Sequence, residues 1–152
     1  MPDVGDRAPD FALPSTDGEV RLSDRLKDAR VLLAFYFEDA TPTCSTEVAS
    51  LKDARDALRE LGADVIAVSA DGLESHRQFA ERLGGLPFPL VSDPQMEAAR
   101  AYDAVAEDDP RRSRRALFAI EQNGTISYAA NPFSPNNLSQ LEGAFRALGL
   151  EL

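Results

Sequence analysis

Apolar residues along this chain occur in short, nearly unbroken runs that are separated by polar segments. Three of the runs are VLLAFYF at 31–37, DVIAVSA at 64–70 and ALFAIE at 116–121. Runs of this length are typical of strands that are buried on both faces of a sheet. A fourth, TISYAA at 125–130, follows the turn sequence QNG, which predicts a hairpin with the strand before it.

Other segments repeat apolar residues at intervals of three or four, the spacing of a helix that buries one face. The longest spans 44–61 and ends before Gly62, a residue type that often terminates helices. Further segments lie at 76–85, 96–105 and 138–148, the last behind an asparagine that can cap a helix. The pattern therefore predicts helices between the apolar runs.

Strands and helices alternate along most of the chain, and the sequence PLVSD adds a short strand at 89–93. This order predicts an α/β fold in which helices flank a central sheet. The length of 152 residues suits one domain, 1–152, with a core of useful size, and no linker or repeat interrupts it. The stretch DDPRRSRR at 108–115 is interpreted as a surface loop.

Composition narrows the class of protein. The hydrophobic share of 43% and the charged share of 28% are those of an ordinary soluble protein. The sequence has neither a transmembrane run nor a secretory signal pattern, so we expect a cytoplasmic protein. A net charge of −10 argues against nucleic acids and membrane surfaces as partners.

The chain contains one cysteine, Cys44, which excludes an internal disulfide. Thr41 is a candidate N-cap and Pro42 suits the first helical position, so Cys44 is expected in the first turn of a helix. The positive end of the helix dipole favours an anion there, and the thiolate is the nucleophilic form of cysteine. The alternative is a small apolar residue on the buried helix face, and the placement alone leaves both interpretations open.

The loop that carries this cysteine resembles that of a known enzyme family. The sequence TPTC at 41–44, directly after an apolar strand, is similar to the active-site loop of the AhpC/TSA-like peroxiredoxins, most closely of their bacterioferritin-comigratory (PrxQ-type) branch. Segments at 4–24, 68–94 and 115–126 resemble the family's N-terminal hairpin, its middle segment and the strand after its active-site arginine. The resemblance implies a thioredoxin-like fold, a mixed sheet flanked by helices with an N-terminal β-hairpin.

The resemblance also implies a set of site residues. Cys44 matches the peroxidatic cysteine, Thr41 the threonine that contacts thiolate and peroxide, and Arg115 the arginine near the sulfur. Attack of a thiolate on an O–O bond moves negative charge onto the departing oxygen, which a guanidinium and a hydroxyl can stabilise. Among the four arginines at 111, 112, 114 and 115, Arg115 fits the family spacing. Neither a metal nor a cofactor is implied.

Two positions depart from the family pattern. Phe37 stands where the family usually has a proline, so Phe37 is expected to shape the pocket together with Pro42 and Thr43. Ala49 stands where many relatives of this branch have a second, resolving cysteine. A sulfenic acid on Cys44 would then need an external thiol, namely thioredoxin, glutaredoxin or a low-molecular-weight thiol. The chain is thus interpreted as a one-cysteine peroxiredoxin for hydrogen peroxide and organic hydroperoxides, and as a monomer or weak homodimer.

Other functions were weighed against this one. A non-enzymatic redox sensor or thiol-binding module on the same fold is the main alternative, since Phe37 and the missing second cysteine are compatible with it. A thioredoxin-type disulfide reductase would need Cys-x-x-Cys, and the chain lacks the tryptophan of glutathione peroxidases. The lone histidine, His76, is interpreted as a surface residue outside any metal site, and Glu47 as a solvated or helix-start charge rather than a proton shuttle.

Overall fold

The structure is a computed structural model that describes residues 2–134 and 137–149, with the backbone alone for Thr43 and Leu138. Five helices and seven strands lie in these ranges. The strands are β1 (Ala12–Ser15), β2 (Gly18–Arg21), β3 (Arg30–Phe35), β4 (Ala63–Ser69), β5 (Leu90–Ser92), β6 (Ala116–Ile120) and β7 (Ile126–Ala130). The helices are α1 (Leu22–Arg25), α2 (Pro42–Glu60), α3 (Leu73–Arg82), α4 (Glu97–Ala101) and α5 (Leu138–Ala147).

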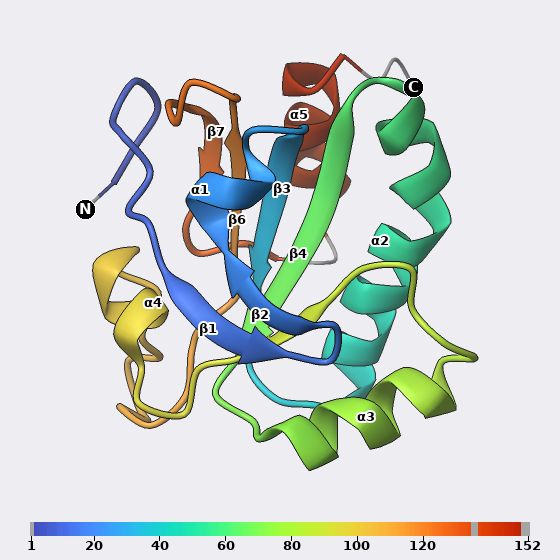
Figure 1. The fold of residues 1–152 in the computed structure, drawn as a ribbon. Helices are drawn as coiled ribbons and strands as arrows, with labels where there is room; N and C mark the ends of the chain where they lie inside the picture. The colour runs from blue at the N-terminus through green and yellow to red at the C-terminus, as the bar shows by residue number, and fades with distance from the viewer. Residues whose placement is uncertain (1, 135–136, 150–152) are drawn as a thin grey trace.

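The seven strands form one mixed sheet in the order β2-β1-β5-β4-β3-β6-β7 (Figure 1). Strand β3 is parallel to β4 on one side and antiparallel to β6 on the other. The hairpin of β6 and β7 is present, as the turn sequence QNG predicted, and so is the N-terminal hairpin of β1 and β2, which the family resemblance implied. The sequence therefore placed β3, β4, β5, β6 and β7 correctly to within one or two residues.

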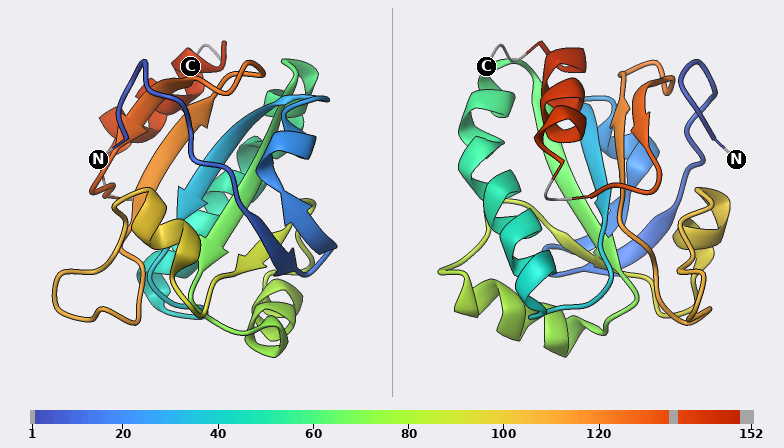
Figure 2. Two further views of the ribbon diagram at one scale, coloured as in Figure 1. Left: turned by 60° about the vertical axis from the view of Figure 1, so that its left-hand side comes forward. Right: turned by 180° about the vertical axis from the view of Figure 1, so that it is seen from behind.

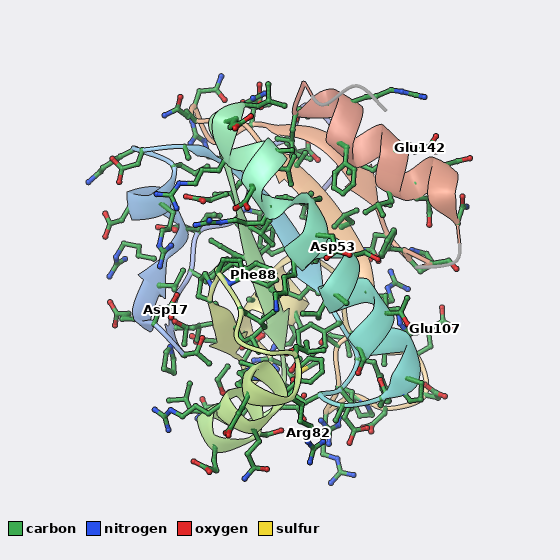
Figure 3. All side chains as sticks on the ribbon, turned by 90° about the vertical axis from the view of Figure 1, so that its right-hand side faces the viewer. Asp17, Asp53, Arg82, Phe88, Glu107 and Glu142 are labelled. Carbon is green, nitrogen blue, oxygen red and sulfur yellow. The ribbon has the colours of Figure 1, made fainter. Side chains whose placement is uncertain are left out.

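Helices cover both faces of this sheet (Figures 1 and 2). Helices α2 and α5 lie side by side on one face, with Asp53 and Glu142 at their outer surface (Figure 3), while α1 and α4 lie on the other. Alternate residues of β3 serve the two cores: Leu32 and Ala34 pack under α2, and Leu33 packs on the opposite side. This alternation follows from the period of two in a strand.

Helix α2 begins where the sequence predicted. The side chain of Thr41 accepts a hydrogen bond from the backbone N–H of Cys44, and Pro42 occupies the first helical position. Gly62 follows the helix with a φ of 78°, a left-handed conformation that glycine adopts at low cost. The first turn of α2 follows β3 after a short loop, because β3 ends at Phe35 and α2 begins at Pro42.

Two predicted helices have different bounds in the structure. Helix α3 begins at Leu73, three residues before the predicted start, so His76 lies inside the helix. Helix α4 ends at Ala101, because Asp103 has a φ of 54°, which a helix cannot continue. Among the described residues, no helix combines the length and apolarity that a bilayer crossing requires.

Candidate active site

Cys44 lies in the first turn of α2 and is fully buried. The guanidinium of Arg115 reaches it from the neighbouring strand, with 3.8 Å between Nη2 and Sγ. The register explains this meeting: β6 runs antiparallel to β3 and pairs Ala116 with Phe35, so the residue before β6 lies beside the chain that leaves β3. Two residues 71 positions apart are thereby brought together, as the sequence predicted.

Thr41 lies at the same helix start and has a clear structural role. Its hydroxyl oxygen accepts the backbone N–H of Cys44 at 3.4 Å, and its O–H donates to the carbonyl of Glu38 at 3.3 Å. The cap is therefore present, whereas the expected contact of this hydroxyl with the thiol is not among the described hydrogen bonds. The side chain of Thr43, also expected to shape the pocket, lies outside the described residues.

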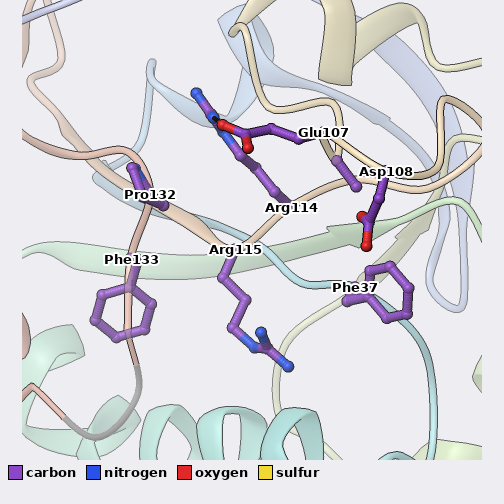
Figure 4. A pocket seen from close by; sticks show the side chains of 8 residues that line it. Phe37, Glu107, Asp108, Arg114, Arg115, Pro132 and Phe133 are labelled. Carbon is purple, nitrogen blue, oxygen red and sulfur yellow. Dashed lines mark ion pairs between the residues drawn. The ribbon is translucent and has the colours of Figure 1, made fainter.

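An open cleft of about 510 Å³ lies beside Arg115 (Figure 4). Arg115 lines this cleft and also contacts the sulfur of Cys44, so its guanidinium lies between the cleft and the thiol. Phe37 lies on one side of the arginine and Phe133 on the other. The cleft is lined by Phe37, Ala106, Glu107, Asp108, Arg114, Arg115, Pro132 and Phe133.

Neighbouring arginines point in different directions. Figure 4 shows Arg114 turned toward Glu107, with which it forms an ion pair at 3.7 Å, and Arg115 turned the opposite way toward α2. Arg112 pairs with Asp71 at 2.8 Å, and the side chain of Arg111 is 91% exposed. Arg115 is therefore the member of this cluster that contacts the thiol, in agreement with the choice made from the sequence.

Glu47 is buried, and its interpretation as a solvated charge was wrong. Its side chain is 2% exposed, and Oε1 lies 3.9 Å from Nε of Arg115. Neither carboxylate oxygen has a hydrogen-bond partner among the described residues. Burial raises the pKa of Glu47 to about 8, although the charge of Arg115 opposes the shift. A carboxyl group that can change charge near neutral pH thus contacts the arginine of the site.

His76 is also buried, and its interpretation as a surface residue was wrong. It is fully inaccessible, with Nδ1 2.8 Å from Oδ2 of Asp39 and Nε2 2.9 Å from the carbonyl oxygen of Val91. The cause is the face that His76 shares with Phe79, one turn later on α3, which packs into the core. Asp39 belongs to the loop between β3 and α2, so the histidine contacts the segment that leads to Cys44.

His76, Asp39 and Asp71 together have the spacing of metal ligands, with donor atoms within 4.8 Å of one another. These atoms are already engaged, however. Tyr36 and Ser75 donate to Asp39, and Ser69 and Arg112 donate to Asp71, at distances between 2.5 and 2.8 Å. The arrangement fits a closed hydrogen-bond network better than a cation site.

The match to known proteins agrees with this geometry. Residues 4–129 match the AhpC/TSA family. The chain belongs to the AhpC/TSA family. Among curated members, it is 34% identical over 140 residues to peroxiredoxin Bcp of Escherichia coli, with 88% of each chain covered. It is 32% identical over 130 residues to a putative peroxiredoxin bcp of Coxiella burnetii, with 82% of this chain and 85% of the relative covered.

A solved structure of the AhpC/TSA family confirms the fold. Peroxidoxin BcpB from Mycobacterium tuberculosis matches with a TM-score of 0.84 and 28% identity, covering 97% of this chain and 95% of that one. The predicted thioredoxin-like fold and the membership in the bacterioferritin-comigratory branch are thereby confirmed. Because these relatives are peroxiredoxins, the chain is a thiol peroxidase, an enzyme with a peroxide substrate and a thiol reductant.

Proposed function

We propose that Cys44 is the peroxidatic nucleophile of a one-cysteine thiol peroxidase, with Arg115 as the second catalytic residue. The observation that carries this assignment is the 3.8 Å contact between the guanidinium and the buried sulfur at the start of α2. A cation at that distance favours the thiolate, as does the positive end of the 19-residue helix. The thiolate is the nucleophilic form of cysteine, so both features place positive charge beside the reacting atom.

The reaction follows from the positions of these charges. The Cys44 thiolate attacks one oxygen of the hydroperoxide, the S–O bond forms, and the O–O bond breaks. The electron pair leaves with the distal oxygen as hydroxide or alkoxide, which takes up a proton to give water or alcohol. Arg115 supplies fixed N–H donors where this negative charge develops. Cys44 is left as a sulfenic acid, oxidised by two electrons.

Three neighbours of the reacting pair act by positioning. Thr41 and Pro42 fix the start of α2 and hence the backbone of Cys44. Oε1 of Glu47 lies 3.9 Å from Nε of Arg115. We assign Glu47 the role of a weak positioning contact, because the two groups are close enough to attract each other but share no hydrogen bond.

The reductant is assigned to an external thiol. Cys44 is the one cysteine of the sequence, so the sulfenic acid condenses with a thiol from another molecule and releases water. A second thiol then reduces the mixed disulfide and restores Cys44. We propose thioredoxin, glutaredoxin or a low-molecular-weight thiol as this reductant, and hydrogen peroxide and organic hydroperoxides as substrates. The cytoplasmic location and the monomeric or weakly dimeric state stay predictions.

The decisive experiment replaces the nucleophile. Wild-type protein mixed with one equivalent of hydrogen peroxide is expected to gain one oxygen on Cys44, seen by mass spectrometry, and to consume peroxide repeatedly when a thiol is added. Cys44→Ser is expected to lose both properties. Thiol-dependent turnover in the Cys44→Ser protein contradicts the assignment. Oxidation of wild-type protein without turnover by any of the three thiol classes favours the redox-sensor alternative instead.

A further inference from the structure

His76 is held in a fully buried position where both ring nitrogens face acceptors. Nδ1 lies 2.8 Å from a carboxylate oxygen of Asp39, and Nε2 lies 2.9 Å from the carbonyl oxygen of Val91. A carbonyl can only accept, so Nε2 must carry a proton. An unprotonated Nδ1 would place a lone pair against the carboxylate in a site without solvent, which is costly. The geometry therefore fits an imidazolium paired with a carboxylate.

The groups around the ring are arranged to keep Asp39 ionised. Burial alone would raise the pKa of Asp39, but hydrogen bonds from His76 and Tyr36 and the charge of His76 outweigh burial and lower it. Burial raises the pKa of Tyr36 well above its ordinary value, so its hydroxyl remains a donor to Asp39. The other charged groups nearby are Asp71, Arg112 and Glu38, and they pair with one another: Arg112 lies 2.8 Å from Asp71 and 3.6 Å from Glu38.

Asp39 transmits this pairing to the catalytic loop. Its carboxylate is held by Tyr36 from the end of β3 and by Ser75 and His76 from α3. Its backbone N–H donates to Asp71 at 2.9 Å. The next residue, Ala40, has a φ of 62°, a conformation that costs energy for a residue other than glycine and persists only where the surroundings impose it. Thr41, the cap of the Cys44 helix, follows directly.

The same network reaches the segment that carries Arg115. Arg112 donates to Asp71, which in turn accepts the backbone N–H of Asp39. Ser113 donates to the carbonyl of Tyr36 at 2.7 Å. The two chain segments that present the sulfur and the guanidinium are thus joined to one buried cluster.

We propose that the buried Asp39–His76 ion pair is a positioning device that sets the Cys44–Arg115 geometry by anchoring the loop between β3 and α2 to α3. Asp39 and His76 do not contact the thiol; they act through the Thr41 cap and the strained Ala40. The inference rests on the proposed peroxidatic role of Cys44 and extends it to two positioning residues, which lie five and 32 residues from Cys44 in the sequence.

Substitution of the pair provides the first test. Asp39→Asn and His76→Gln each remove the charge pairing and are expected to slow the single-turnover oxidation of Cys44 by hydrogen peroxide by about 10- to 100-fold, the range for a displaced reacting group. The double variant Asp39→Asn/His76→Gln restores a neutral amide pair, so its loss is expected not to exceed that of the worse single variant. Losses that multiply would show that the two residues act independently and would overturn the proposal.

A matched control separates positioning from general loss of stability. Asp93 is a buried acid whose carboxylate accepts backbone N–H groups of α4 at 2.8 and 3.0 Å and has no described hydrogen bond to Asp39, His76 or Asp71. Asp93→Asn is expected to lower the melting temperature but leave the rate of Cys44 oxidation within about twofold of wild type. If Asp93→Asn slows oxidation as much as Asp39→Asn at a comparable melting temperature, the proposal is wrong.

The second test uses the wild-type protein and needs no variant. His76 is the one histidine of the chain, so its ring nitrogens can be observed directly by ¹⁵N NMR of the wild-type protein. We expect both nitrogens to be protonated at pH 7 in the reduced protein, and their signals to shift when Cys44 is oxidised to the sulfenic acid. A neutral ring at pH 7, or identical signals in reduced and oxidised protein, overturns the proposal.

These outcomes are distinct from failure of the proposed function. An inactive wild-type protein, or an active Cys44→Ser variant, refutes the role of Cys44. A wild-type protein that oxidises normally, with an Asp39→Asn variant that oxidises equally fast, refutes the positioning device alone.

Discussion

Two buried acidic residues flank Cys44 in the sequence, Asp39 on the side of the preceding loop and Glu47 on the side of α2, and their surroundings differ sharply. Asp39 accepts hydrogen bonds from Tyr36, Ser75 and His76, all within 2.8 Å. Glu47 has one charged neighbour, Arg115, at 3.9 Å and no hydrogen-bond partner among the described residues. The pKa of Asp39 is lowered and that of Glu47 is raised to about 8.

The comparison shows that the partners of a buried acid decide its charge. Burial destabilises both carboxylates, but only Asp39 receives enough donors to stay ionised. A saturated group of this kind fixes the chain around it. A group with a loose partner retains freedom to change its charge, and here that group contacts the guanidinium that meets the reacting sulfur. Asp39 thus keeps the preceding loop in place, whereas Glu47 can gain or lose a proton next to Arg115.

Replacement of Arg115, the one charged neighbour of Glu47 in the described part of the chain, should have the largest effect on the rate of Cys44 oxidation. Arg115→Ala deletes the cation near the thiolate and the departing oxygen, and loss of one fixed donor costs roughly 10²–10³ in rate. We expect the rate of Cys44 oxidation to fall by this factor, measured by quenching the reaction at set times and analysing the protein by mass spectrometry. Arg115→Lys should recover part of the rate because it keeps the charge without the planar donors.

Arg111→Ala serves as the control for Arg115→Ala, since the Arg111 side chain is 91% exposed. It is expected to leave the rate unchanged. A large decrease for Arg114→Ala with a normal rate for Arg115→Ala would contradict the opposed orientation of the two side chains.

The two sides of the loop were not equally visible in the sequence. Cys44, Thr41 and Arg115 were identified because the cap, the helix start and the family spacing point to them. Glu47 was missed, although it lies three residues after Cys44 and one before Val48, inside the buried stripe of α2. The rule that charged residues face solvent outweighed that spacing.

His76 was missed for a different reason. Its partner, Asp39, lies 37 residues away, and only the packing of α3 brings the two together. The spacing to Phe79 indicated a buried face. No local pattern, however, identifies the hydrogen-bond acceptors, Asp39 and the Val91 carbonyl, that allow the histidine ring to be buried. The strands and main helices depend on local periodicity and were predicted well, whereas polar contacts between elements depend on register and packing.

Opposite pH dependence of stability would sharpen the comparison. Because the pKa of Glu47 is raised, its neutral form stabilises the fold fully below the ordinary pKa of 4.5, and this contribution is lost as the pH rises through about 8. Glu47→Gln lacks the titration. In a Cys44→Ser background, which removes thiol ionisation, we expect the variant to gain stability relative to its parent between pH 5 and 9, by on the order of several kcal/mol.

The measurement is the free energy of unfolding in urea at pH 3, 5, 7 and 9. Asp39→Asn should behave in the opposite sense: a lowered pKa stabilises the fold above the ordinary value of 3.8 and ceases to do so as the pH falls through the folded pKa. The cost of Asp39→Asn should therefore shrink on acidification below 3.8. Parallel stability curves for Glu47→Gln and its parent would show that Glu47 ionises normally and that the contrast with Asp39 is absent.

Substitution of Phe37 should have the smallest effect on the oxidation rates. Phe37 lies next to residues that contact Asp39 and Glu47 but is not a partner of either acid. It follows Tyr36 of the saturated network, lines the open cleft beside Arg115, and packs partly against the core under α2. An alkyl group in the cleft could bury roughly 40 Å² against this ring, worth about 1 kcal/mol or some fivefold in rate. Phe37→Pro, which introduces the usual family residue, should raise the rate for hydrogen peroxide relative to a bulky alkyl hydroperoxide by that factor.

Stability must be measured beside both rates, because proline also fixes the backbone angle directly after Tyr36. Phe37→Leu is the matched control: it keeps an apolar side chain and a free backbone but removes the aromatic face. If the ring itself selects apolar peroxides, both variants change the ratio of the two rates. If only Phe37→Pro changes the ratio of the two rates, the backbone of the loop is responsible rather than the ring. The effect then has the same origin as that of the Asp39 substitution, a change in loop position. An unchanged ratio in two folded variants with wild-type melting temperatures would leave substrate selection to the rest of the cleft, above all to Arg115 and Phe133 on its far side.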